Sequence, residues 1–219
     1  MLQSPPTIRL SPNRETYPQR LRACLAASPL PVIAVRGDVA ILENKLLALF
    51  CSARCPGDLI LKTYDLARNL RESGTTVVSG FHSPMERECL DLLLRGTQPV
   101  VICPARGIDT MRLPRQWSSA IQQGRMLMLS PFAGTVRRPT NRTAAQRNDF
   151  VAAIADAVFV AHASPGSKTE AFCRRLRLLG KLLFTLPGLQ NSALLALGAV
   201  AIDPACPPAF WPSPSEKRA

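Results

Sequence analysis

The sequence of 219 residues is long enough for one full domain with an appendage, but too short for two independent catalytic domains. Apolar residues make up 47% of it, and no apolar run approaches the roughly 18 residues of a membrane span, which excludes disordered and membrane-spanning chains. Lysine and arginine number 27 against 15 aspartates and glutamates, and this net charge of +12 indicates a polyanionic partner such as nucleic acid.

Prolines are frequent at both ends of the sequence. We therefore expect residues 1–16 to form a flexible N-terminal tail and residues 203–219 to form a Pro-rich C-terminal tail. Residues 17–202 are predicted to fold as a single domain. Its first part, residues 17–45, has the pattern of a short helix followed by a strand at 31–35, and we expect it to pack on the main sheet as an extension because it is too small to fold alone.

From residue 46 onward, short apolar runs alternate with longer amphipathic segments. The short runs are apolar on both sides, which is typical of strands buried on both faces of a parallel sheet. The expected fold class is therefore α/β, an extended Rossmann-like, mostly parallel sheet with helices on both faces. The predicted strands are residues 46–51, 75–79, 99–103, 125–129, 157–161 and 182–186, and the predicted helices are residues 59–72, 84–95, 114–123, 143–155, 168–179 and 191–197.

The loops after the strands are the candidate ligand sites, because open parallel sheets bind ligands at the carboxyl ends of their strands. The loop after the strand at 46–51 offers Ser52, Arg54 and Gly57 just before a helix, whose free N–H groups attract anions. The strand at 75–79 ends in Ser79 and Gly80, which are also small and suited to phosphate.

The loop after the strand at 157–161 has the strongest features of a phosphate site. It combines a flexible glycine with two hydroxyls and a positive charge at a helix N-terminus. It matches neither a Walker A loop nor the G-x-G-x-x-G dinucleotide fingerprint. Under the alternative interpretation, Ser167 or Thr169 simply caps the helix. The candidate residues of this loop are Gly166, Ser167, Lys168 and Thr169.

Half of the positive charge lies in residues 111–150, where seven arginines face a single acid. The planar guanidinium group suits phosphate better than a lysine ammonium does. The alternative is a solvated basic face without a ligand. The candidates for DNA or phosphate binding in and beside this segment are Arg137, Arg138, Arg142, Arg147 and Asn148.

Cysteine and histidine spacing predicts neither a metal site nor a catalytic site. The seven cysteines form no C-x-x-C pair, and His82 and His162 are the two histidines. There is no G-x-S-x-G or H-E-x-x-H motif, so we expect no metal, no cofactor and no enzymatic activity. The first residues lack a secretion signal, which predicts a cytoplasmic protein with reduced thiols. Cys51 and Cys55, which flank the first loop, are candidates for reactive thiols.

A series of short motifs resembles the DNA-processing protein A (DprA/Smf) family. In chain order they are Arg36-Gly37-Asp38, Val77-Val78-Ser79-Gly80, Arg147-Asn148, Pro187-Gly188 and Gly198-Ala199. The resemblance covers about residues 17–202 and concerns the Rossmann core only. It implies a protein of DNA recombination or natural transformation that binds single-stranded DNA, usually as a homodimer, and passes the strand to the recombinase RecA.

The sequence departs from this family at its ligand loops. Ser52-Ala53-Arg54 with Gly57 is a shortened form of the family's G-S-R loop, and residues 82–86 replace its A-x-G-I-D run. Pro165-Gly166 followed by Thr169-Glu170 is similar instead to the P-G-G-x-G-T-x-x-E loop of the LOG (lysine-decarboxylase-like) family. This second resemblance implies an alternative function, that of a nucleotide-binding sensor or nucleoside-monophosphate hydrolase.

Overall fold

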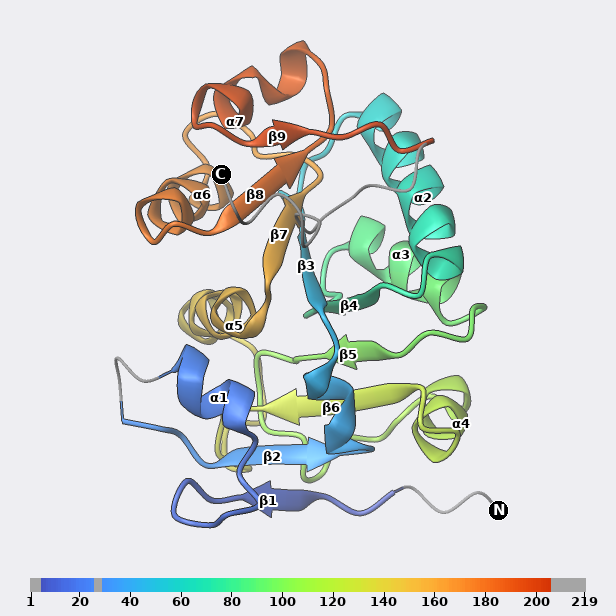
Figure 1. The fold of residues 1–219 in the computed structure, drawn as a ribbon, viewed down its shortest axis with the longest axis vertical. Helices are drawn as coiled ribbons and strands as arrows, with labels where there is room; N and C mark the ends of the chain where they lie inside the picture. Colours follow the sequence, from blue (N-terminus) through green and yellow to red (C-terminus); the bar gives the residue numbers. More distant parts are fainter. Residues whose placement is uncertain (1–4, 26–28, 206–219) are drawn as a thin grey trace, which may run out of the picture.

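The computed structural model describes residues 5–25 and 29–205 and contains one nine-stranded sheet (Figure 1). The strands are β1 Ile8–Leu10, β2 Ile33–Arg36, β3 Leu46–Phe50, β4 Thr76–Ser79, β5 Val100–Ile102, β6 Met126–Ser130, β7 Ala157–Val160, β8 Leu182–Thr185 and β9 Val200–Ala201. The helices are α1 Gln19–Cys24, α2 Gly57–Glu72, α3 Pro84–Leu93, α4 Arg115–Gln122, α5 Asn141–Ile154, α6 Lys168–Leu178 and α7 Ser192–Ala196, with 3-10 turns η1 Val39–Glu43 and η2 Leu189–Asn191.

The sheet order is β1-β2-β6-β5-β4-β3-β7-β8-β9. From β3 the chain builds β4, β5 and β6 toward one edge, then returns to the other side of β3 and builds β7, β8 and β9 toward the opposite edge. The pairings from β6 to β9 are parallel. The fold is therefore α/β and Rossmann-like, as predicted, and the direction of strand addition reverses between β3 and β7, where such sheets bind ligands.

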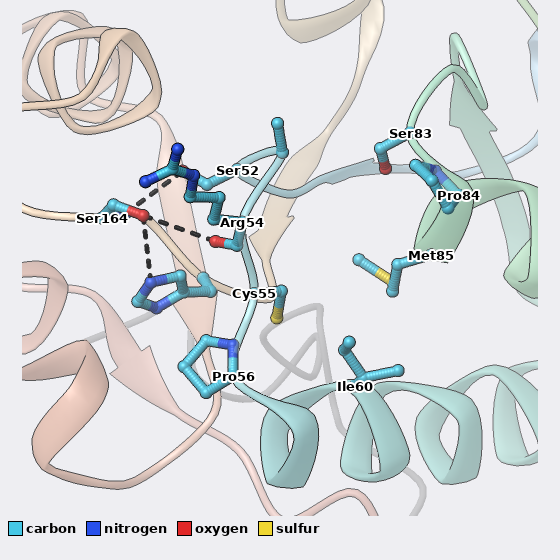
Figure 2. Close-up of a pocket in the computed structure, with 11 residues that line it drawn as sticks. Ser52, Arg54, Cys55, Pro56, Ile60, Ser83, Pro84, Met85 and Ser164 are labelled. Atoms are coloured by element: carbon cyan, nitrogen blue, oxygen red, sulfur yellow. Dashed lines mark hydrogen bonds between the residues drawn. The ribbon is translucent and has the colours of Figure 1, made fainter.

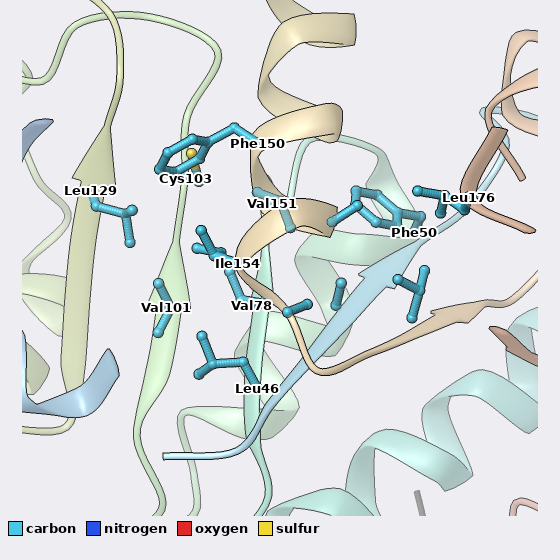
Figure 3. Close-up of a cluster of buried hydrophobic side chains, with 14 of the residues drawn as sticks. Leu46, Phe50, Val78, Val101, Cys103, Leu129, Phe150, Val151, Ile154 and Leu176 are labelled. Atoms are coloured by element: carbon cyan, nitrogen blue, oxygen red, sulfur yellow. The ribbon is translucent and has the colours of Figure 1, made fainter. Parts of the chain in front are cut away.

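Helices cover both faces of the sheet, because successive side chains of each central strand point to opposite faces. On one face, Leu47 and Val77 join the buried side chains of α2 and α3. On the other face, shown in Figure 3, Val78 and Val101 pack against Val151 and its neighbours on α5. The five residues of β3 are all buried, which explains why the predicted strands show continuous apolar runs instead of alternation.

The N-terminal extension is larger than the sequence analysis predicts. β2 pairs antiparallel with β6 and covers that edge of the sheet, and β1 pairs antiparallel with β2. Residues 8–10 fall within the segment for which a flexible tail is expected, but pairing with β2 gives their backbone groups hydrogen-bond partners and makes them the edge strand. Residues 206–219 of the expected C-terminal tail lie outside the described residues.

No helix among the described residues combines the length and the apolar character required to cross a membrane. The same part of the chain contains no group of three or more histidine, cysteine or acidic side chains arranged to hold a metal ion.

Candidate nucleic-acid interface

Two cavities lie along the carboxyl edge of the parallel strands. The first, of about 550 Å³, lies between β3 and β7 at the reversal of strand order and is drawn in Figure 2. The second, of about 830 Å³, lies beyond β4 and β5 and extends to the start of α5. The first cavity is lined mainly by residues 52–56, with Ser83, His162 and Ser164, and the second mainly by residues 80–82, 104–106 and 139–141, with Arg87, Trp117 and Arg147.

The loop after β3 forms one wall of the first cavity. The Ser52 amide donates to the His162 carbonyl at 2.9 Å, and the Ser52 hydroxyl accepts from the Ser164 amide at 3.2 Å. These bonds use the buried Ser52 to hold the loop against β7, whereas the Arg54 side chain is exposed at the cavity. Gly57 begins α2 without a capping side chain, so amides of the first helical turn remain available to an anion.

Ser79 and Gly80, at the end of β4, support the second cavity in different ways. The buried Ser79 hydroxyl donates to the Leu49 carbonyl at 2.7 Å and accepts from the Phe81 amide, so it stabilises the loop instead of facing a cavity. A β-carbon on Gly80 would lie 0.8 Å from Nη1 of Arg147. Gly80 is therefore the residue that makes room for the Arg147 guanidinium.

Arg147 is 6% exposed and lines the second cavity from α5. Its Nε donates to Asn148 Oδ1 at 2.7 Å and its Nη1 donates to the Cys103 carbonyl at 3.3 Å. Burial raises the pKa of the Cys103 thiol to about 12 in spite of the nearby guanidinium, so this thiol stays neutral. Because no carboxylate of the described residues forms an ion pair with Arg147, its charge is buried without an acidic partner.

The exposed arginines of the basic segment lie beside the second cavity. Arg137 and Arg138 precede α5, and Arg142 lies in its first turn. Thr140 caps this helix by accepting from the Thr143 amide at 3.1 Å, and it lines the cavity together with Asn141. The helix N-terminus and the three arginines therefore place positive potential next to Arg147.

The loop after β7 is used differently from the sequence prediction. Gly166 has a φ of +70° and its amide donates to Glu170 Oε2 at 2.7 Å, while the Ser167 hydroxyl accepts from the Glu170 amide and caps α6. The Gly166 amide and Arg174 lower the pKa of Glu170. The Gly166 amide therefore already donates its hydrogen bond to a carboxylate of this chain. The alternative interpretation, helix capping by Ser167, describes this geometry. Lys168 and Thr169 line a small separate cavity with Asn148.

The two thiols that flank the first loop differ. A hydrogen bond between their side chains, together with burial, raises the pKa of Cys51, and the same bond lowers the pKa of Cys55. Cys55 lines the first cavity. The reactive thiol expected at this loop is therefore better assigned to Cys55 than to Cys51.

The family model of DNA recombination-mediator protein A matches residues 9–196. The chain belongs to this family. Comparison with curated proteins found no sequence match.

Solved structures of the DNA recombination-mediator protein A family share the fold. DNA processing protein A (DprA) from Streptococcus pneumoniae has a TM-score of 0.73 at 20% identity, over 93% of this chain and 73% of that one. DNA processing protein A from Helicobacter pylori, described for its single-stranded DNA binding mode, has a TM-score of 0.71 at 22% identity, over 89% of each chain. A molybdenum cofactor binding protein from Rippkaea orientalis reaches a TM-score of 0.51 at 11% identity, over 74% of this chain and 91% of that one. The family match favours the DNA-processing interpretation over the nucleotide-hydrolase alternative.

Two side chains at the first cavity, Ser164 and Asn191, are not among the residues predicted from the sequence. Ser164 lies at the cavity, and Asn191, from η2, hydrogen-bonds to the His162 ring that lines it. No local pattern could have selected Asn191, because it follows His162 by 29 residues and acts through a tertiary contact. Ser164 lies two residues after His162 in the loop that follows β7, and its position in a loop after a strand is the signal that could have selected it.

Proposed function

We propose that this chain binds single-stranded DNA through its phosphates, along the carboxyl edge of the sheet. Arg54 would bind one phosphate at the first cavity, and Arg147 would bind another at the second, with Arg137, Arg138 and Arg142 beside it. The observation that carries the proposal is the buried Arg147 guanidinium, which lines an 830 Å³ cavity and has no carboxylate partner among the described residues. A phosphate supplies the negative charge that such a group lacks.

Family membership supports this proposal, since the Helicobacter pylori relative is described for single-stranded DNA binding. The proposal includes no catalytic step, because phosphate binding alone accounts for the arginines at the two cavities. The homodimer, the RecA partner and the cytoplasmic location implied by the sequence stay predictions.

The test compares one arginine at the carboxyl ends of the parallel strands with one at their amino ends. Arg54→Ala should weaken binding of a 20-nucleotide oligo-dT about five- to tenfold. It should also reduce the slope of the logarithm of the affinity against the logarithm of the salt concentration by about 0.7, the contribution of one phosphate contact in single-stranded DNA. Arg95→Ala is the matched control. Arg95 is also exposed, but it follows α3 and lies at the amino ends of the parallel strands. Fluorescence anisotropy at several salt concentrations measures both quantities. Equal affinities of the two variants would overturn the proposal.

A further inference from the structure

A chain of three hydrogen-bonded side chains lies beneath the first cavity, and the proposed function does not use it. Asn191 is completely buried, and its Oδ1 lies 3.0 Å from Nδ1 of His162. His162 is 6% exposed, and Nε2 of its ring lies 3.3 Å from the Ser164 hydroxyl. The Ser164 hydroxyl in turn lies 3.4 Å from the carbonyl oxygen of Arg54.

Asn191 determines which nitrogen of the ring carries the hydrogen. Its side-chain nitrogen donates to the Ala161 carbonyl at 2.9 Å and to the Leu186 carbonyl at 3.1 Å. Because carbonyl oxygens only accept, the amide nitrogen must face them and Oδ1 must face the ring. Nδ1 of His162 therefore donates to Asn191, and in the neutral ring Nε2 is left as an acceptor.

Ser164 has one hydroxyl hydrogen but two acceptors in reach. Figure 2 draws both contacts of Ser164 as dashed lines. With a neutral ring, the hydrogen goes either to Nε2 of His162 or to the Arg54 carbonyl, and the other acceptor lacks this donor. With a protonated ring, Nε2–H donates to the Ser164 oxygen, and the hydroxyl hydrogen is then free to bind the Arg54 carbonyl. Protonation therefore satisfies both contacts and fixes the backbone of the loop that carries Arg54.

We propose that His162 is a positioning residue of the interface, whose protonation fixes the Arg54 loop through Ser164 and strengthens phosphate binding. This inference rests on the proposed function and adds a proton linkage to it. The uptake of one proton by the ring also places a positive charge at the first cavity, where the DNA phosphate would lie.

The charged groups on the elements around the ring are compatible with this role. Arg54 is the charged side chain among the described residues that line the first cavity, and Cys55, whose pKa is lowered by its hydrogen bond with Cys51, is a titratable thiol there. The carboxylates on neighbouring elements accept hydrogen bonds from other groups. Asp58 on α2 accepts from the side chain of Gln190. Glu86 on α3 accepts from the backbone amides of Cys51, His82 and Ser83. Glu170 on α6 accepts from the Gly166 amide and the Arg174 guanidinium.

The test uses the fact that the chain has two histidines. Affinity for an oligo-dT without a terminal phosphate is measured at pH 5.5 and pH 7.5 at constant ionic strength. We expect the wild-type affinity to be about fivefold higher at pH 5.5, the upper end of the effect of one partly exposed ion pair. His162→Gln should lose most of this difference. His82→Gln changes the exposed histidine of the second cavity and measures the share that comes from that site, and a loss as large as that in His162→Gln would overturn the inference.

A second variant separates positioning from added charge. Ser164→Ala keeps the His162 ring but removes the contact with Arg54, so most of the pH dependence should disappear while the fold, followed by circular dichroism, is retained. Full pH dependence in Ser164→Ala, or in a folded His162→Gln, would overturn the inference while the proposed function stands. Absence of DNA binding in the wild type at both pH values would overturn both. A neutral ring with its hydrogen on Nε2, observed by nitrogen NMR of the free protein, would also overturn the inference.

Discussion

Arg147 and Gly80 are coupled at the scale of single residues. The guanidinium of Arg147 lies in the space that a β-carbon at position 80 would occupy, with 0.8 Å between that position and Nη1. The glycine is required here for close approach and not for backbone conformation, since Gly80 is not among the glycines with positive φ. A side chain at position 80 would have to displace the arginine from its contact with the Cys103 carbonyl.

A double-mutant cycle tests this coupling. Gly80→Ala in the wild type should lower the free energy of unfolding by about 1–3 kcal/mol, as overpacking in a well-packed site does, and should weaken oligo-dT binding because Arg147 moves. In an Arg147→Ala background the same change should cost less than about 0.5 kcal/mol, because the colliding group is gone. Urea unfolding measures the four stabilities. An equal cost of Gly80→Ala in both backgrounds would contradict the steric explanation.

At the scale of elements, Arg20 and Asp156 join the N-terminal extension to the main sheet. Arg20 on α1 donates to Asp156 Oδ2 at 2.8 Å and to the Ile154 carbonyl at the end of α5 at 3.1 Å. Asp156, just before β7, also accepts from the Leu46 amide at 2.8 Å and from Lys45 at 3.1 Å. One carboxylate therefore connects α1, β3 and β7, three elements that are distant in the sequence.

This carboxylate predicts an acid-dependent stability. Burial raises the pKa of Asp156, but the hydrogen bonds from the Leu46 amide, Lys45 and Arg20 together outweigh it, so the pKa in the folded protein is lowered. The ionised Asp156 carboxylate therefore stabilises the fold fully at pH values above its unfolded-state pKa, which is near 3.9. This stabilisation is lost as the pH falls through the lower pKa of the folded protein. Asp156→Asn should cost about 1–2 kcal/mol at pH 7, and its stability should fall less steeply than that of the wild type below pH 5.

The measurement is urea unfolding between pH 3 and pH 7. Asp149→Asn is the matched control, because Asp149 on α5 pairs with Arg175 through side chains that are both more than half exposed. Such a pair contributes little, so this variant should follow the wild type. An Asp156→Asn curve parallel to the wild type at all pH values would show that the carboxylate does not carry the acid dependence.

Elements with strong apolar patterns could be predicted from the sequence, and elements held by pairing alone could not. Strands such as β3 and β7 are buried throughout, so apolar runs of the right length identified them. β1 has two exposed residues of three, and its strand conformation depends on its pairing with β2. The same distinction holds at the candidate site, where the arginines were recognised by charge. The occupation of the Gly166 amide by Glu170 depends on a side chain folding back across the loop, which composition does not specify.

At the scale of the whole molecule, the positive charge is only partly directed toward the interface. Arg137, Arg138 and Arg142 lie beside the second cavity. Arg125 belongs to the same basic segment, but it donates to the carbonyls of Leu94 and Gly96 at the amino end of β6, the opposite edge of the sheet. A net charge of +12 therefore overstates the number of phosphates that the interface can neutralise.

The salt dependence of binding measures the number of DNA phosphates that the interface neutralises. If the interface neutralises about four phosphates of a single strand, the logarithm of the affinity should fall with the logarithm of the salt concentration with a slope of about −3, since each contact contributes about −0.7. Fluorescence anisotropy of labelled oligo-dT between 50 and 300 mM KCl gives the slope. A slope near −8 would mean that the whole basic surface binds DNA without a defined path, and a slope near zero would mean that phosphates are not the ligand. An intermediate slope that is shallower in Arg54→Ala but unchanged in Arg95→Ala would place the contacts at the carboxyl ends of the parallel strands, because Arg54 lies in the loop after β3 and Arg95 lies before the start of β5.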